Sequence, residues 1–193
     1  MTKLEKNNII QSLVITSDPQ YPWTPRMDNN DNGESEAETK RISENLIREQ
    51  YQNINSYTNS VSNASIIING DITSYGHSWQ WIKMTDELLP ILNRPFYFGL
   101  GNHDIENNQG DCFQDSCFSK SMVNLRAHIN NMGLSSFQVD IDKYHKNGSF
   151  GYAVDFGDVY SLQLNNYPTM KYFSLHSGFE LKENMNWIEQ NLK

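Results

Sequence analysis

A run of three isoleucines that ends in a turn constrains this chain most. Residues 66–68 are all isoleucine, and Asn69, Gly70 and Asp71 follow directly. Three consecutive β-branched residues are too few for a helix and are typical of a strand buried on both faces. Gly70 lets the backbone turn sharply at the end of that strand, so Asp71 stands at its carboxyl end. The run therefore predicts a central strand with a carboxylate at its tip.

Two other apolar runs repeat this design. Residues 13–17 precede Asp18, and residues 95–99 precede Asn102 and His103. The carboxyl ends of strands in an open α/β sheet form the edge at which ligands bind. Because these three strand ends carry carboxylate, amide and imidazole groups, the sequence predicts a metal site at that edge.

Helical segments separate the predicted strands. Apolar residues recur at helical spacing, and a strand, helix and strand in succession predict a parallel pair with a right-handed crossover. The expected helices cover residues 35–54, 78–92, 121–132 and 180–192. Residues 149–156 and 159–164 alternate with period two around Gly157-Asp158, which predicts an antiparallel hairpin.

The length and charge of the chain limit its class and its partners. We expect one domain over residues 1–193, with 15 basic and 23 acidic residues and a net charge of −8. An acidic balance argues against general binding to nucleic-acid backbones or anionic membranes. No apolar run approaches the roughly 18 residues of a membrane span. No signal peptide is visible, so the sequence fits either a cytoplasmic protein or a secreted mature form and leaves its location and oligomeric state open.

The two cysteines, Cys112 and Cys117, are spaced more widely than a C-x-x-C redox or zinc motif. A local disulfide in an oxidising compartment and a pair of free thiols are equally consistent with this spacing. His77, in Gly76-His77, is interpreted as a helix-start or surface histidine rather than a catalytic one.

The strand-end residues resemble the calcineurin-like metallophosphoesterases. That family's pattern is Asp-x-His, then Gly-Asp, then Gly-Asn-His-Asp/Glu, then a lone His and a Gly-His-x-His block. The matching segments here read Asp18-Pro19-Gln20, Gly70-Asp71 and Gly101-Asn102-His103-Asp104, and the last two blocks are absent. The likeness extends over essentially the whole chain and suggests the purple acid phosphatase/acid sphingomyelinase type.

The resemblance implies an α/β fold, a metallophosphoesterase-like β-sandwich flanked by helices. In that family, a helix similar to residues 180–192 is followed by another strand and then by the histidine block. The chain is therefore expected to be the N-terminal portion of a longer domain, incomplete at its C-terminus.

The resemblance also implies a dinuclear centre of divalent or trivalent metal ions, with Mn, Fe or Zn as candidates. It assigns Asp18 to the first ion and Asn102 to the second, with Asp71 as the bridge between them. Gln20 stands where the family has histidine. Its amide oxygen can coordinate, but more weakly than an imidazole.

His103 matches the family residue that protonates the leaving oxygen or holds the phosphoryl group. Asp104 is expected to orient the other ring nitrogen of His103, and the two are the predicted catalytic pair.

The predicted function is hydrolysis of a phosphomonoester or phosphodiester by a metal-bound hydroxide. The predicted partner is accordingly a phosphate-ester substrate. The alternative is a non-catalytic or degenerate binding module with the same fold, which Gln20 and the absent histidines support. The 193 residues by themselves are expected to show weak or no activity.

Overall fold

The computed structural model describes residues 11–31, 33–142 and 144–193. The expected domain and the search for a leader peptide both include residues 1–10, which lie outside this part. Across the described ranges, no helix combines the length and apolar character needed to cross a bilayer.

Three parallel strands form the sheet that carries the candidate site. They are β1 (Ser12–Thr16), β2 (Ala64–Ile68) and β3 (Phe96–Phe98), in the order β1-β2-β3. Every residue of β2 is buried, as expected for a strand with neighbours on both edges and cover on both faces. The parallel register pairs Thr16 with Ile68 and Ile68 with Phe98, so the three strands end side by side.

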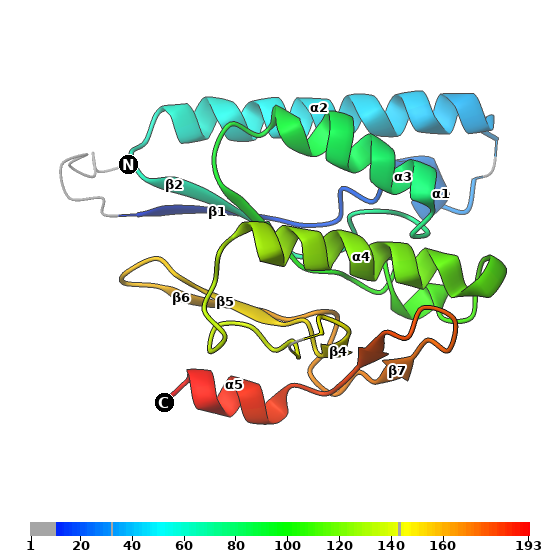
Figure 1. The fold of residues 1–193 in the computed structure, drawn as a ribbon. Coiled ribbons are helices and arrows are strands. Elements are labelled where there is room, and N and C mark those ends of the chain that lie inside the picture. Colours follow the sequence, from blue (N-terminus) through cyan, green and yellow to red (C-terminus); the bar gives the residue numbers. More distant parts are fainter. Residues whose placement is uncertain (1–10, 32, 143) are drawn as a thin grey trace.

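A long helix connects the first two strands. α2 (Glu36–Asn59) begins with a capping box, in which the Ser35 side chain accepts from the Glu38 backbone and the Glu38 side chain accepts from the Ser35 backbone. Its buried residues include Ile47, Tyr51 and Ile54, which follow the predicted helical spacing. Figure 1 shows α2 above β1 and β2, with α3 (Ser78–Lys83) below the other half of α2 in this view.

The expected helix over residues 78–92 is not a continuous α-helix. α3 ends at Lys83 and continues as a π-helix, η2 (Met84–Leu88), and a 3-10 helix, η3 (Leu89–Ile91). Pro90 lies in the 3-10 helix, and its missing N–H prevents the regular α-helical pattern from continuing.

The segment after β3 is more helical than predicted. It contains two 3-10 turns, η4 (Glu106–Asn108) and η5 (Phe113–Asp115), and then α4 (Ser116–Asn131). α4 begins five residues before the predicted start. Its first turns carry Cys117 and Phe118, both buried, so packing there stabilises the early turns.

The C-terminal third contains the predicted hairpin and a small additional sheet. β5 (Tyr152–Asp155) and β6 (Tyr160–Gln163) pair antiparallel, which confirms the hairpin. α5 (Met185–Asn191) is shorter than predicted because residues 180 and 181 form a strand instead. The additional sheet has the order β4-β8-β7 and consists of β4 (Asn147–Gly148), β7 (Tyr172–Phe173) and β8 (Glu180–Leu181). The α/β class is therefore confirmed, with the described strands in three sheets.

The side chain of His128 is partly buried among aromatic rings. The His128 ring, on α4, stacks on Phe98 with centroids 4.1 Å apart and on Phe96 at 5.7 Å. Its Nε2 atom accepts the backbone N–H of Phe98 at 3.3 Å, which requires that nitrogen to be unprotonated. Burial lowers the pKa of His128 to about 4.

We therefore expect His128 to make the protein less stable in acid. The unfolded chain binds more protons than the folded one between the folded-state pKa of about 4 and the usual value of 6.5. The free energy of unfolding should fall as pH falls through this window, by up to about 3 kcal/mol. Urea denaturation of wild type and His128→Gln at several pH values measures this. The variant should show a shallower pH dependence, and the exposed His145→Gln should retain the wild-type slope.

Candidate functional site

Three of the predicted metal ligands line one cavity at the carboxyl ends of the parallel strands. Asp18 follows β1, Asp71 follows β2 and Asn102 follows β3, and all three line a cavity of about 440 Å³. The expected convergence of the strand ends is thus present in the fold. Their role as ligands stays a prediction.

Backbone hydrogen bonds continue between the chain segments beyond the strand ends. The Asp18 N–H donates to the Gly70 carbonyl at 3.3 Å, and the Gln20 N–H donates to the Asp71 carbonyl at 2.8 Å. Tyr21 forms an isolated parallel bridge with Thr73. The segment after β1 therefore runs beside the segment after β2. This pairing fixes Asp18 relative to Asp71.

Three predicted ligand positions have a left-handed backbone. The φ angles are 53° at Asp18, 44° at Gln20 and 48° at Asp71, and none of these residues is glycine. Such conformations cost about 1 kcal/mol or more each and cluster at functional sites. The surrounding hydrogen bonds hold these three residues in a backbone conformation that free peptides rarely adopt.

The Asp71 carboxylate lies in a tight cradle. Its Oδ1 atom accepts the backbone N–H of His103 at 2.9 Å. A β-carbon at Gly101 would overlap the same carboxylate, and a β-carbon at Gly70 would come within 2.7 Å of the Gly101 nitrogen. Both glycines are therefore needed for the close approach of the β2 and β3 segments. Burial raises the pKa of Asp71, and the neighbouring Asp18 carboxylate raises it further.

The expected pairing of His103 with Asp104 is wrong. Asp104 is fully buried, and its two oxygens accept the backbone N–H groups of Ile72, Thr73 and Gly101 at 2.9, 2.8 and 3.2 Å. The Thr73 hydroxyl also donates to it at 2.8 Å. Burial raises the pKa of Asp104 to about 7, and these hydrogen bonds oppose the shift. The carboxylate is oriented toward the backbone after β2 because that segment offers it a full set of donors.

A backbone carbonyl takes the place of Asp104 beside the His103 ring. His103 Nδ1 lies 3.0 Å from the Ser74 carbonyl oxygen. Since that oxygen can only accept, the hydrogen bond places a proton on Nδ1 and leaves Nε2 free of this contact. Trp23 packs edge-on against the ring, with centroids 5.3 Å apart. The imidazole is thus held by the Ser74 carbonyl at Nδ1 and by the Trp23 ring.

Gln20 lines a different cavity from the other predicted ligands. A neighbouring cavity of about 540 Å³ is lined by Gln20 together with Trp23 and Asp28, and Asp18 lines both cavities. The structure therefore brings Gln20 near Asp18 but does not place it among the residues that line the first cavity.

The sequence analysis missed three amide side chains that line the first cavity: Asn69, Gln163 and Asn166. Gln163 ends β6, and its Nε2 atom donates to the Ile68 carbonyl at 3.1 Å. The Asn166 backbone N–H donates to the Leu100 carbonyl at 2.8 Å. For Gln163 and Asn166, the sequence signal was the predicted hairpin, because its second strand ends near them.

The donor set of the first cavity fits a metal cation. Asp18 and Asp71 supply neighbouring carboxylates, and Asn102 supplies a neutral amide oxygen. Two carboxylates held close together repel each other, and a bound cation removes that repulsion. The fold is thus an α/β domain whose parallel strand ends carry oxygen donors suited to a metal cation.

Comparison with known protein families identifies the family of this chain. The calcineurin-like phosphoesterase family matches residues 12–192, and the chain belongs to that family. Searches of curated proteins and of solved structures gave no match.

The contacts of Asp104 predict a structural effect for Asp104→Asn. An asparagine keeps one oxygen but turns an NH₂ group toward two of the present donors, so the substitution should cost about 2 to 4 kcal/mol of stability. Urea denaturation measures this loss. Asp158→Asn, in the exposed turn between β5 and β6, is the matched control and should leave stability unchanged. Wild-type stability in Asp104→Asn would contradict the structural role that these contacts assign to Asp104.

Proposed function

We propose that this protein hydrolyses phosphomonoesters or phosphodiesters at a dinuclear metal site. The observation that carries the proposal is the convergence of Asp18, Asp71 and Asn102 on one cavity at the ends of three parallel strands. Membership of the calcineurin-like phosphoesterase family supports the reaction class. The proposed partner is therefore a phosphate-ester substrate, and the net charge of −8 argues against a nucleic-acid backbone.

Each candidate ligand has a proposed place in the site. Asp71 lies between the other two strand ends and is the proposed bridging ligand, with Asp18 and Asn102 on either side. Mn, Fe or Zn ions bound there would lower the pKa of a coordinated water and neutralise charge on the phosphate oxygens. The close approach of Gly101 and the His103 N–H fix the Asp71 carboxylate before a metal binds.

His103 is the proposed proton donor to the leaving oxygen. Its Nδ1 proton is committed to the Ser74 carbonyl, so a proton on Nε2 is the one available for transfer. The edge-on contact with Trp23 and the Ser74 contact limit ring rotation. Asp104 acts in this proposal as a positioning residue, because it fixes the Ile72–Thr73 backbone just before Ser74.

Three finer features also stand as proposals. They are the purple acid phosphatase/acid sphingomyelinase subtype, the two-layer β-sandwich, and residues 1–193 as the N-terminal part of one incomplete domain. The first two rest on the family match over residues 12–192. The third rests on the family pattern, in which the histidine blocks come after a helix similar to α5.

The rival function is a non-catalytic binding module with the same fold. Its specific support is Gln20, which replaces the family histidine and lines the neighbouring cavity rather than the one with Asp71 and Asn102. Elemental analysis of a chain extended past Lys193 separates the two proposals. Two metal ions per chain favour the enzyme, and none favours the binding module.

Asp71→Asn should abolish the proposed activity. Replacing the bridging carboxylate with an amide removes a charge that both ions need, so hydrolysis of an aryl phosphate should fall at least about 100-fold. The assay uses the extended chain with Mn, Fe or Zn added, and Asp158→Asn should retain wild-type turnover. Unchanged turnover in Asp71→Asn would contradict the assignment of the site.

A further inference from the structure

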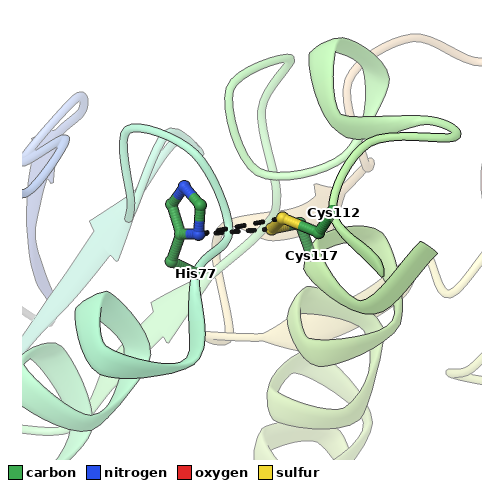
Figure 2. Close-up of side chains that lie close together, drawn as sticks. All are labelled: His77, Cys112 and Cys117. Atoms are coloured by element: carbon green, nitrogen blue, oxygen red, sulfur yellow. Dashed lines mark hydrogen bonds between the residues drawn. A yellow bond between two sulfur atoms is a disulfide. The ribbon is translucent and has the colours of Figure 1, made fainter. Parts of the chain in front are cut away.

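A second group of metal-ligand side chains lies outside the cavity described above. His77, Cys112 and Cys117 each offer one ligand atom, and these three atoms lie within 4.8 Å of one another. In this structure Cys112 and Cys117 form a disulfide, which decides between the two states that the sequence left open. Figure 2 shows the His77 ring directed at this disulfide, with Nδ1 at 3.7 Å from Cys112 Sγ and 3.6 Å from Cys117 Sγ.

Three elements bring these side chains together. His77 is the N-cap residue of α3, Cys112 precedes η5, and Cys117 lies in the first turn of α4. The segments approach closely, because a β-carbon at Gly76 would come within 2.9 Å of the Cys117 carbonyl oxygen. The packing of α3 against α4 therefore fixes the histidine beside the sulfurs.

The distances from His77 Nδ1 to the two sulfur atoms already match those of a tetrahedral zinc site. Zinc binds thiolate sulfur at about 2.3 Å and imidazole nitrogen at about 2.0–2.1 Å, so a tetrahedral angle places nitrogen and sulfur about 3.6 Å apart. The observed distances of 3.7 and 3.6 Å match this spacing. The two sulfurs would have to separate to about 3.8 Å, which requires the disulfide to be broken.

We infer that reduction of the disulfide converts this cluster into a zinc site with His77, Cys112 and Cys117 as ligands. A dithiol reductant transfers two electrons and two protons to the disulfide, which yields two thiols and the oxidised dithiol. Zinc then displaces one proton from each thiol and binds two thiolates and the neutral His77 Nδ1. Oxidation by a disulfide-class oxidant re-forms the S–S bond and releases the ion.

The surroundings favour the thiolate form and a soft metal. Cys117 lies in the first turn of the sixteen-residue α4, where unpaired backbone N–H groups stabilise negative charge on sulfur. Two sulfurs and one nitrogen favour zinc-like ions, whereas the oxygen donors around Asp71 also suit harder ions such as Mn²⁺. Three protein ligands leave a fourth position for water. Because the cluster lies outside the first cavity, the inference does not depend on phosphoesterase activity.

Cobalt binding tests this inference, because cobalt in place of zinc gives a thiolate-to-metal absorption band only when sulfur is a ligand. The full chain is reduced anaerobically with a phosphine and titrated with Co²⁺, and Zn²⁺ is then added to displace the cobalt. The reduced protein should develop the band with one equivalent of cobalt and lose it on zinc addition, and the oxidised protein should show no band. The oxygen-donor cavity does not contribute to this signal.

Two histidine variants test the geometry. Reduced His77→Gln should bind cobalt at least about tenfold more weakly, because it loses one of three protein ligands. Reduced His145→Gln, an exposed histidine on another loop, should bind as the wild type does. The inference is overturned if the reduced wild type, with both thiols titrated and its circular dichroism unchanged, gives no band. Equal affinity in His77→Gln and wild type would also overturn it.

Discussion

The geometry of the candidate site depends on one buried carboxylate. Asp104 is removed from solvent, which is costly for a charge, and four donors from Ile72, Thr73 and Gly101 compensate for the lost water. These donors belong to the segments after β2 and β3. The two segments are therefore fixed relative to each other, and Asp71 lies in the first of them while Asn102 lies in the second.

The strand end after β1 is also held by hydrogen bonds to a neighbouring segment, but these bonds are weaker. The segment after β1 has no comparable buried charge, and it is held by backbone hydrogen bonds from Asp18 and Gln20 to the segment after β2. These bonds keep Asp18, Gln20 and Asp71 in left-handed conformations that would otherwise relax. The cost of the strained backbone is thus offset by pairing that begins where the regular sheet ends.

The strand ends were predictable from sequence, because a buried parallel strand has a local signature in the isoleucines of residues 66–68. The contacts of Asp104 were not, because its donors lie about thirty residues earlier in the chain, and adjacency to His103 suggested a different partner. Gln163 and Asn166 were missed for a similar reason, since their contact with the site depends on where a distant hairpin packs. The state of Cys112 and Cys117 also needed three-dimensional structure, because their spacing fits both thiols and a disulfide.

One segment of the chain connects the two candidate metal sites. Asn108 donates to the His103 carbonyl at 2.6 Å, and the Gly110 N–H donates to Asp115 at 3.1 Å, so residues 103–117 are held by contacts along their length. One end of this segment follows the oxygen donors of the first cavity, and the other end carries the two sulfurs. Zinc is a candidate ion for both proposed sites, but only the second site offers sulfur ligands. The contacts of Asn108 and Asp115 therefore hold the segment between the two proposed sites.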